Sequence, residues 1–196
     1  MNQAPGVYSF EGVTPVIDPS AYVHPAATLI GDVFIGPGCF VAAGAVLRGD
    51  FGRIVMERES NLQDNCVVHT LTDFDCVLAE HSHIGHGAVV HAVHVGRGVL
   101  VGMNAVVMDR STIGEYTMVA AMAFVKIGAQ IPPRVLVAGV PAKVVRELSD
   151  EDIARKARGT AGYVELARRC LAGERPAQAL TVADAGRLAT RTRWRD

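Results

Sequence analysis

The stretch 95-VGRGVLVGMNAVVMDRSTIGEYTMVAAMAFVKIGAQIPPRVLV-137 decides the fold, because an aliphatic residue returns in it at every sixth position. We call these residues the repeat positions. The residue four places after each of them is mostly small, as at Ala105, Thr117 and Ala129. Neither an α-helix, with 3.6 residues per turn, nor a strand that alternates every second residue keeps this register. Short strands that meet at corners do keep it, so the stretch predicts a parallel β-helix.

The same six-residue repeat covers most of the chain upstream. It runs from Ile17 to Leu47, resumes from Met56 to Val68, and resumes again from Leu78 to Val90. Three hexads make a coil of about 18 residues, and stacked coils lie about 4.8 Å apart, so equivalent residues on neighbouring coils form ladders. This pattern resembles the left-handed hexapeptide-repeat β-helix, a triangular prism, and the left hand is what that resemblance implies.

The repeat stops after Val145, and a helix is predicted beyond it. Ser149 and Asp152 have the spacing of a capping box, which marks a helix N-terminus. Gly159 and Gly162 are expected to bend or divide that helix. We therefore expect four segments: an N-terminal arm (1–14), a β-helix (15–145), a C-terminal helix packing on the β-helix (146–175), and a flexible tail (176–196).

Composition narrows the classes of function. The chain has 196 residues with 19 basic and 20 acidic side chains, so it lacks the positive charge that binds a nucleic acid backbone. No apolar run approaches the roughly 20 residues that span a bilayer, and no export signal is recognisable, so we expect a cytoplasmic protein without membrane contact. Four separated cysteines without a Cys-x-x-Cys motif favour small buried side chains over disulfides or thiolate metal sites.

The histidines gather where the repeat is interrupted. Six of the seven lie between His69 and His94. His69 and His91 each follow a repeat position, and their 22-residue separation equals one coil plus about four residues, which the loop after His69 can absorb. We therefore expect them to stack on one face. His86 lies near a corner and is not expected to converge with them in the same chain, although a partner subunit could supply it.

Three neutral imidazoles with one open coordination position form a catalytic metal site of the zinc type. Such a metal lowers the pKa of bound water toward roughly 7 and so produces hydroxide at neutral pH. The alternative is a set of solvated histidines, one of which acts as a base. Spacing alone does not choose between them, because His81, His83 and His94 crowd the same stretch.

Several motifs carry a resemblance to a known family. Together they resemble the gamma-class carbonic anhydrases, and most closely the PaaY/CaiE subfamily of phenylacetate and carnitine operons. The motifs are LRGD (47–50), NLQDN (61–65), His69, the pair His86 and His91, and the subfamily strings RGDFGRIV (48–55), GMNAVVMD (102–109) and PAKVVREL (141–148).

The resemblance implies a homotrimer with a divalent metal at each subunit interface, Zn²⁺ first and Fe²⁺ or Co²⁺ as alternatives. It implies His69 and His91 from one chain and His86 from the next as ligands. It also implies that Gln63 bonds the metal-bound hydroxide, that Arg48, Asp50 and Asp64 form an intersubunit ion-pair network, and that Tyr163 approaches the pocket. The alternatives are that Arg48 and Asp50 only stabilise the interface and that Tyr163 only packs the helix.

The activity is expected to differ from that of the best-studied anhydrases. Phe51 stands where those enzymes carry a glutamate that shuttles protons, and the loop 70–75 lacks their long acidic insertion. CO2 hydration must export a proton in each turnover, so this loss should slow it. The resemblance therefore implies a PaaY-like thioesterase acting on ring-hydroxylated phenylacetyl-coenzyme A, with Phe51 as an apolar wall or a corner filler. Hydration of CO2 to bicarbonate is the alternative.

Two rivals of another class remain open. The ending AGVPAK (138–143) also resembles hexapeptide-repeat acyltransferases. Those enzymes bind acyl-coenzyme A between subunits, use one histidine as a general base and need no metal. A structural trimer without catalytic activity is the second rival.

Overall fold

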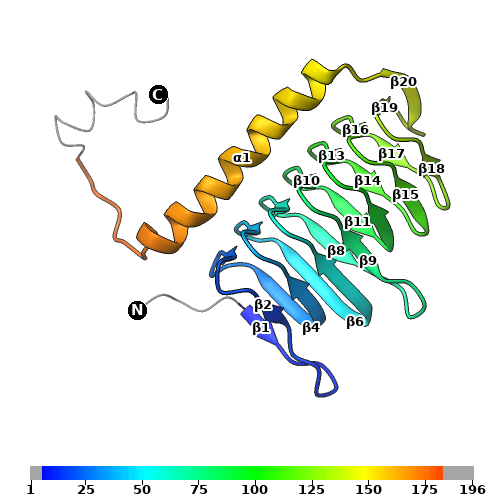
Figure 1. Cartoon of the computed structure of the whole chain (residues 1–196). Helices are drawn as coiled ribbons and strands as arrows, with labels where there is room; N and C mark the ends of the chain where they lie inside the picture. Colours follow the sequence, from blue (N-terminus) through cyan, green and yellow to red (C-terminus); the bar gives the residue numbers. More distant parts are fainter. Residues whose placement is uncertain (1–5, 183–196) are drawn as a thin grey trace.

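The computed structural model describes residues 6–182 and shows a parallel β-helix with one α-helix along its side (Figure 1). The predicted fold class is confirmed: the chain is mainly β, is built of hexapeptide coils, and has a C-terminal helix. Three faces form the prism. Strands of the first and second faces belong to one 12-stranded sheet, and strands of the third face form an 8-stranded sheet.

The first two faces are joined because two long strands turn the corner between them. These are β4 (Thr28–Ile35) and β6 (Val46–Met56). Their N-terminal halves lie in the first face with β1 (Gly6–Tyr8), β8 (Val67–His69), β11 (Val89–His91), β14 (Val106–Val107) and β17 (Phe124–Val125). Their C-terminal halves lie in the second face with β2 (Val16–Ile17), β9 (Cys76–Leu78), β12 (Val93–Val95), β15 (Ser111–Ile113) and β18 (Gln130–Ile131).

The third face carries the helix. Its parallel strands are β3 (Tyr22–Val23), β5 (Phe40–Val41), β7 (Asn61–Leu62), β10 (His83–Ile84), β13 (Leu100–Val101), β16 (Met118–Val119) and β19 (Val135–Ala138). The last strand, β20 (Lys143–Glu147), pairs antiparallel to β19 and so ends the run of parallel coils.

The core is the stack of repeat positions. Residues such as Leu47, Leu62 and Val107 are completely buried, and so are the small residues Ala45 and Ala105 that alternate with them. Burying an aliphatic side chain of this size contributes roughly 1.5–3 kcal/mol. Large and small side chains alternate inside a narrow prism, which explains why so few aromatic rings are present.

Corners need residues that adopt a left-handed backbone. Asn104 has φ 55° and Gly87, one coil earlier in the same ladder, has φ 70°. The left-handed backbone at Gly87 favours glycine, and a Cβ there would also press on the side-chain oxygen of Asn104. Asn104 and Gly87 therefore both occupy corners between strands.

The helix α1 (Asp150–Gly173) runs back along the β-helix (Figure 1). Ser149 is its N-cap and forms the predicted capping box with Asp152, and three acidic residues in the first turn complement the helix dipole. Gly159 and Gly162 do not divide it, because both are exposed and the side chains that face the third face continue on either side of them. Tyr163 and Ala167 pack against Tyr22 and Phe40.

The two ends of the chain differ from the β-helix between them. Strand β1 falls within the expected arm and pairs in parallel with β4, where the edge of β4 offers unpaired backbone groups. The expected tail begins inside the described part of the chain but reaches beyond it, since residues 183–196 lie outside the described residues. Within residues 6–182, no helix has the length and apolar character needed to cross a membrane.

Candidate functional site

Two imidazoles stand side by side at one edge of the first face. His69 ends β8 and His91 ends β11, and the two residues are paired directly in the ladder. Nδ1 of His69 lies 2.9 Å from Nε2 of His91. The predicted stacking of these two residues is confirmed, because a loop at Leu71 to Phe74 absorbs the extra residues between their coils.

Each imidazole has a carboxylate behind it. Nε2 of His69 lies 3.0 Å from Oδ1 of Asp50, and Nδ1 of His91 lies 2.6 Å from Oδ1 of Asp109. Arg48 donates a 2.6 Å hydrogen bond to the other oxygen of Asp50. Burial raises the pKa of Asp50, but the hydrogen bonds from Arg48 and His69 outweigh it and hold that pKa below its usual value. Asp50 is therefore ionised and accepts the N–H of His69.

This arrangement assigns the protons of the pair. If each ring donates its N–H to its own carboxylate, Nδ1 of His69 and Nε2 of His91 both present lone pairs to one another across 2.9 Å. Two facing lone pairs repel unless a positive species lies between them. With these tautomers, the pair presents two lone pairs of the kind that accept a proton or coordinate a metal cation.

The surroundings of His69 favour its neutral form. Burial lowers its pKa, and the positive charge of Arg48 and the neighbouring His91 lower it further, while the hydrogen bond with Asp50 opposes them. A neutral imidazole can accept a proton or bind a metal. The ring of Phe51 lies 5.4 Å from that of His69 and is half exposed, so it forms an apolar border on the solvent side.

His86 lies at the opposite edge of the first face. Its Nδ1 is 2.8 Å from Oδ2 of Asp64, and both side chains are exposed. His86 lies in the corner turn that precedes β11, whereas His91 is the last residue of β11, so the two side chains lie at opposite ends of this segment. One chain therefore does not bring His86 to the imidazole pair.

Gln63 and Tyr163 lie in a third place, at the contact between the third face and α1: Gln63 follows β7, and Tyr163 is part of α1. Gln63 is buried, and its Nε2 donates to Oδ1 of Asn61 at 3.2 Å and contacts Nε2 of His83. The ring of Tyr163 packs edge-on against His83 and tilted against Phe40. Burial raises the pKa of Tyr163 and lowers that of His83 to about 4.

The predicted site residues thus fall into three groups within one chain. One edge of the first face holds His69, His91, Arg48 and Asp50. The other edge holds His86 and Asp64. The contact between α1 and the third face holds Gln63 and Tyr163. In residues 6–182 of a single chain, no three His, Cys, Asp or Glu side chains are arranged to hold a metal ion. A three-histidine site requires a ligand from a second copy.

Sequence reasoning missed two residues of these groups. Asp109 accepts the hydrogen bond that orients His91. Asp109 lies 18 residues after His91, which is the length of one coil, so the spacing could have predicted this contact. His83 is one of the crowded histidines, but its place beside Gln63 and beneath Tyr163 depends on how the helix docks, which the repeat does not record.

The chain is similar in sequence to a known protein family and to named proteins. A family model described as "Bacterial transferase hexapeptide (six repeats)" matches residues 92–126. The chain is 50% identical over 181 residues to a protein named carnitine operon protein CaiE from Proteus sp. (strain LE138), with 92% of each chain covered.

Two solved structures are similar over most of the chain. One is a candidate acetyltransferase from Bacillus cereus, 31% identical, with a TM-score of 0.83 over 85% of this chain and 96% of that one. The other is a hexapeptide transferase family protein from Anaplasma phagocytophilum, 36% identical, with a TM-score of 0.80 over 86% and 98%.

These comparisons correct the expected function. The relative from Proteus sp. carries the CaiE name, as do relatives from Salmonella agona and Escherichia coli, and the two similar structures are named as transferases. The prediction of a hydrolase, a thioesterase for phenylacetyl derivatives with CO2 hydration as its alternative, is therefore wrong. The error has a chemical reason: one activated imidazole can deprotonate water or another acceptor, so the motif residues do not distinguish hydrolysis from transfer.

Proposed function

The chain belongs to the CaiE family of hexapeptide-repeat proteins, and from this premise we propose that it transfers an acyl group from an acyl-coenzyme A thioester to a small acceptor in carnitine metabolism. The CaiE name supports the metabolic setting, and the transferase names of the two similar structures support the reaction class. The observation that carries the proposal is the hydrogen-bonded pair Asp50–His69, completed by His91 and Asp109.

The pair performs general base catalysis. A lone pair of the two facing nitrogens takes the proton from the hydroxyl or amine of the acceptor, whose oxygen or nitrogen then attacks the thioester carbonyl carbon. The carbon–sulfur bond breaks, and the coenzyme A thiolate leaves and takes up the proton. Asp50 fixes the tautomer of His69 and stabilises the positive charge that forms, as carboxylates do behind catalytic histidines.

Acceptor dependence tests the proposal. Purified protein is incubated with acetyl- or butyryl-coenzyme A, with and without carnitine and a panel of small hydroxyl and amine compounds. Free thiol and acylated product are followed by absorbance and mass spectrometry. We expect thiol release to rise with acceptor concentration and to match the acylated product. Thiol release at the same rate in water alone would contradict transfer.

The facing lone pairs also support a divalent metal at the same place. As an alternative to the general base, in which the lone pairs are coordinated and do not accept the acceptor's proton, we propose that His69 and His91 hold the metal together with His86 of the partner subunit in a homotrimer, with Zn²⁺ as the first choice and Fe²⁺ or Co²⁺ as alternatives. The donor set fits, because each imidazole is oriented by a carboxylate, as second-sphere partners orient metal-binding histidines. When bound, such a cation supplies Lewis-acid polarisation of the thioester carbonyl.

The metal proposal is tested by a change at the exposed histidine. His86→Ala should keep the trimer but lose the metal, whereas wild-type protein purified without chelator should contain about one ion per chain. Elemental analysis and sedimentation measure the two properties. A metal-free wild type, or a His86→Ala protein that keeps its metal, would contradict the shared site. Dissociation into monomers would instead assign His86 to assembly.

A further inference from the structure

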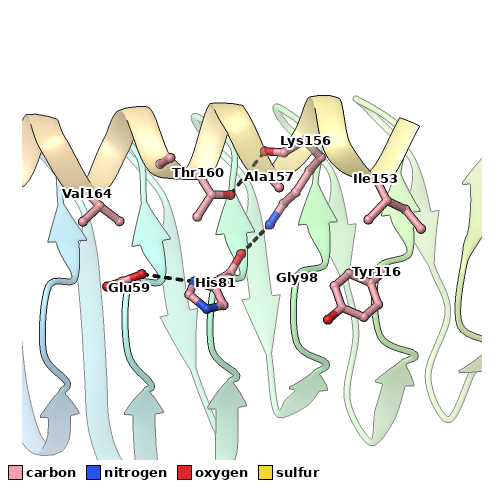
Figure 2. A pocket seen from close by; sticks show the side chains of 10 residues that line it. Glu59, His81, Gly98, Tyr116, Ile153, Lys156, Ala157, Thr160 and Val164 are labelled. Carbon is pink, nitrogen blue, oxygen red and sulfur yellow. Dashed lines mark hydrogen bonds and ion pairs between the residues drawn. The ribbon is translucent and has the colours of Figure 1, made fainter. Parts of the chain in front are cut away.

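A cavity of about 330 Å³ lies between α1 and one corner of the β-helix (Figure 2), and neither residue of the imidazole pair lines it. Residues of successive coils, among them Glu59, His81 and Tyr116, line its floor, and Ile153 and Val164 of α1 line its roof. Its volume is at the lower end of the range of small-molecule sites, which begins near 300 Å³. The cavity can therefore hold a compact ligand.

Lys156 is the reactive group of this cavity. The residue is buried, and its Nζ donates a hydrogen bond to the backbone carbonyl of His81 (Figure 2). Among the described residues, no carboxylate forms an ion pair with it. Burial lowers its pKa to about 8, so about a tenth of the amine is neutral at pH 7. A desolvated amine of this kind is a nucleophile toward carbonyl compounds.

The walls indicate which carbonyl compounds fit. Ile153, Ala157 and Val164 offer aliphatic surface, and Tyr116 offers a ring. None of the described lining residues is an arginine, so no second fixed cation is present to hold a carboxylate. The floor also holds a carboxylate beside an imidazole, because Oε2 of Glu59 lies 3.4 Å from Nδ1 of His81. A neutral carbonyl compound with a short aliphatic chain suits this lining better than a 2-oxo acid.

We propose that the cavity binds a neutral aliphatic aldehyde and that Lys156 holds it as an imine. The lone pair of Nζ attacks the carbonyl carbon, forming a carbon–nitrogen bond while the oxygen takes up a proton. The hydroxyl of this carbinolamine leaves as water with a proton supplied by the adjacent Glu59–His81 pair, and nitrogen loses its second proton to give the imine. One water is released, and no oxidant or reductant is needed.

Reductive trapping tests the assignment. The full chain is treated with limiting butanal and cyanoborohydride at neutral pH, then digested and mapped by mass spectrometry. The chain has three lysines, Lys126, Lys143 and Lys156, and the first two are exposed. We expect the butyl group on Lys156 in large excess over the other two. Labelling spread evenly over the three lysines and the N-terminus would overturn the proposal.

Variants separate the amine from the cavity. Lys156→Arg keeps the charge and should abolish trapping at this position, while Lys126→Arg, at an exposed site, should leave the trapping unchanged. Ala157→Phe keeps Lys156 but fills the cavity from an exposed helix position, and should slow the labelling at least tenfold. Unslowed labelling in Ala157→Phe would overturn the cavity's role. Mapping of the wild-type chain decides the amine even if Lys156→Arg does not fold.

Discussion

The imidazole pair at the edge of the first face and the histidine beneath α1 are held in opposite ways. His69 and His91 each have a carboxylate partner and face each other across an open position for a positive species. His83 touches Gln63 through one nitrogen, and its other nitrogen, Nδ1, is buried without a hydrogen-bond partner among the described residues. One arrangement favours taking up a proton or cation, and the other disfavours it.

The two histidine environments are formed by different parts of the structure. The pair is assembled by the ladder itself, since Arg48, His69 and His91 occupy equivalent places on three successive coils. The environment of His83 is made by the helix, which covers it with Tyr163. A change in the ladder should therefore affect chemistry, and a change in the helix should affect stability.

The largest expected effect comes from replacing one histidine of the imidazole pair and, separately, the histidine covered by α1. His69→Gln removes the base and should lower kcat/KM for acyl transfer by about 10²–10⁴-fold, the usual contribution of a general base. His83→Leu is the matched control, because Leu100 occupies the equivalent place on the next coil, and its activity should stay close to wild type. Steady-state kinetics on both folded variants measure this. Equal losses in the two variants would remove the distinction.

The second prediction concerns acid stability. The pKa of His83 is about 4 in the folded chain and 6.5 in its ordinary state, so between these values the unfolded chain binds more protons. The free energy of unfolding should therefore fall as the pH is lowered from 6.5 to 4, by about 3 kcal/mol at 1.36 kcal/mol per unit. Urea unfolding at several pH values should show a shallower decline in His83→Leu than in wild type. Parallel curves would place the acid sensitivity elsewhere.

The smallest expected effect concerns the start of the helix. Ser149→Ala removes the N-cap hydrogen bond to Asp152 and should lower the free energy of unfolding by about 1 kcal/mol. Acyl transfer should not change, because the imidazole pair makes no contact with this cap. Urea unfolding and the transfer assay measure the two quantities. A loss of transfer activity in this variant would show that the helix and the pair are coupled.

The six-residue repeat was enough to predict the coils, the buried ladder and the register of His69 with His91. It could do so because every repeat position has the same environment, so spacing alone fixes a residue's height and face. Asp109 was equally accessible, being one coil beyond His91. The predicted helix start at Ser149 followed from local hydrogen bonding, which needs no tertiary information.

The rest depended on contacts that no periodicity encodes. The burial of His83, Gln63 and Lys156 follows from the docking of α1, which places residues 75 positions apart in contact, as Lys156 and His81 are. The role of His86 depends on a second chain. The choice between water and another acceptor depends on the substrate, and the motif residues are the same for both reactions.

The helix and the prism also measure length on different scales. One helical turn advances 5.4 Å along the axis, whereas one coil of the β-helix advances about 4.8 Å. The position of helix side chains relative to the coils therefore shifts by about 0.6 Å with each turn. The cavity extends along α1 from Ile153 to Val164, whereas Ala167, about one turn further, is buried against Tyr22 and Phe40. A single residue inserted into α1 between Lys156 and Ala167 would rotate the first part of the helix by about 100°. Lys156 would then turn away from the β-helix, and the cavity would close or move.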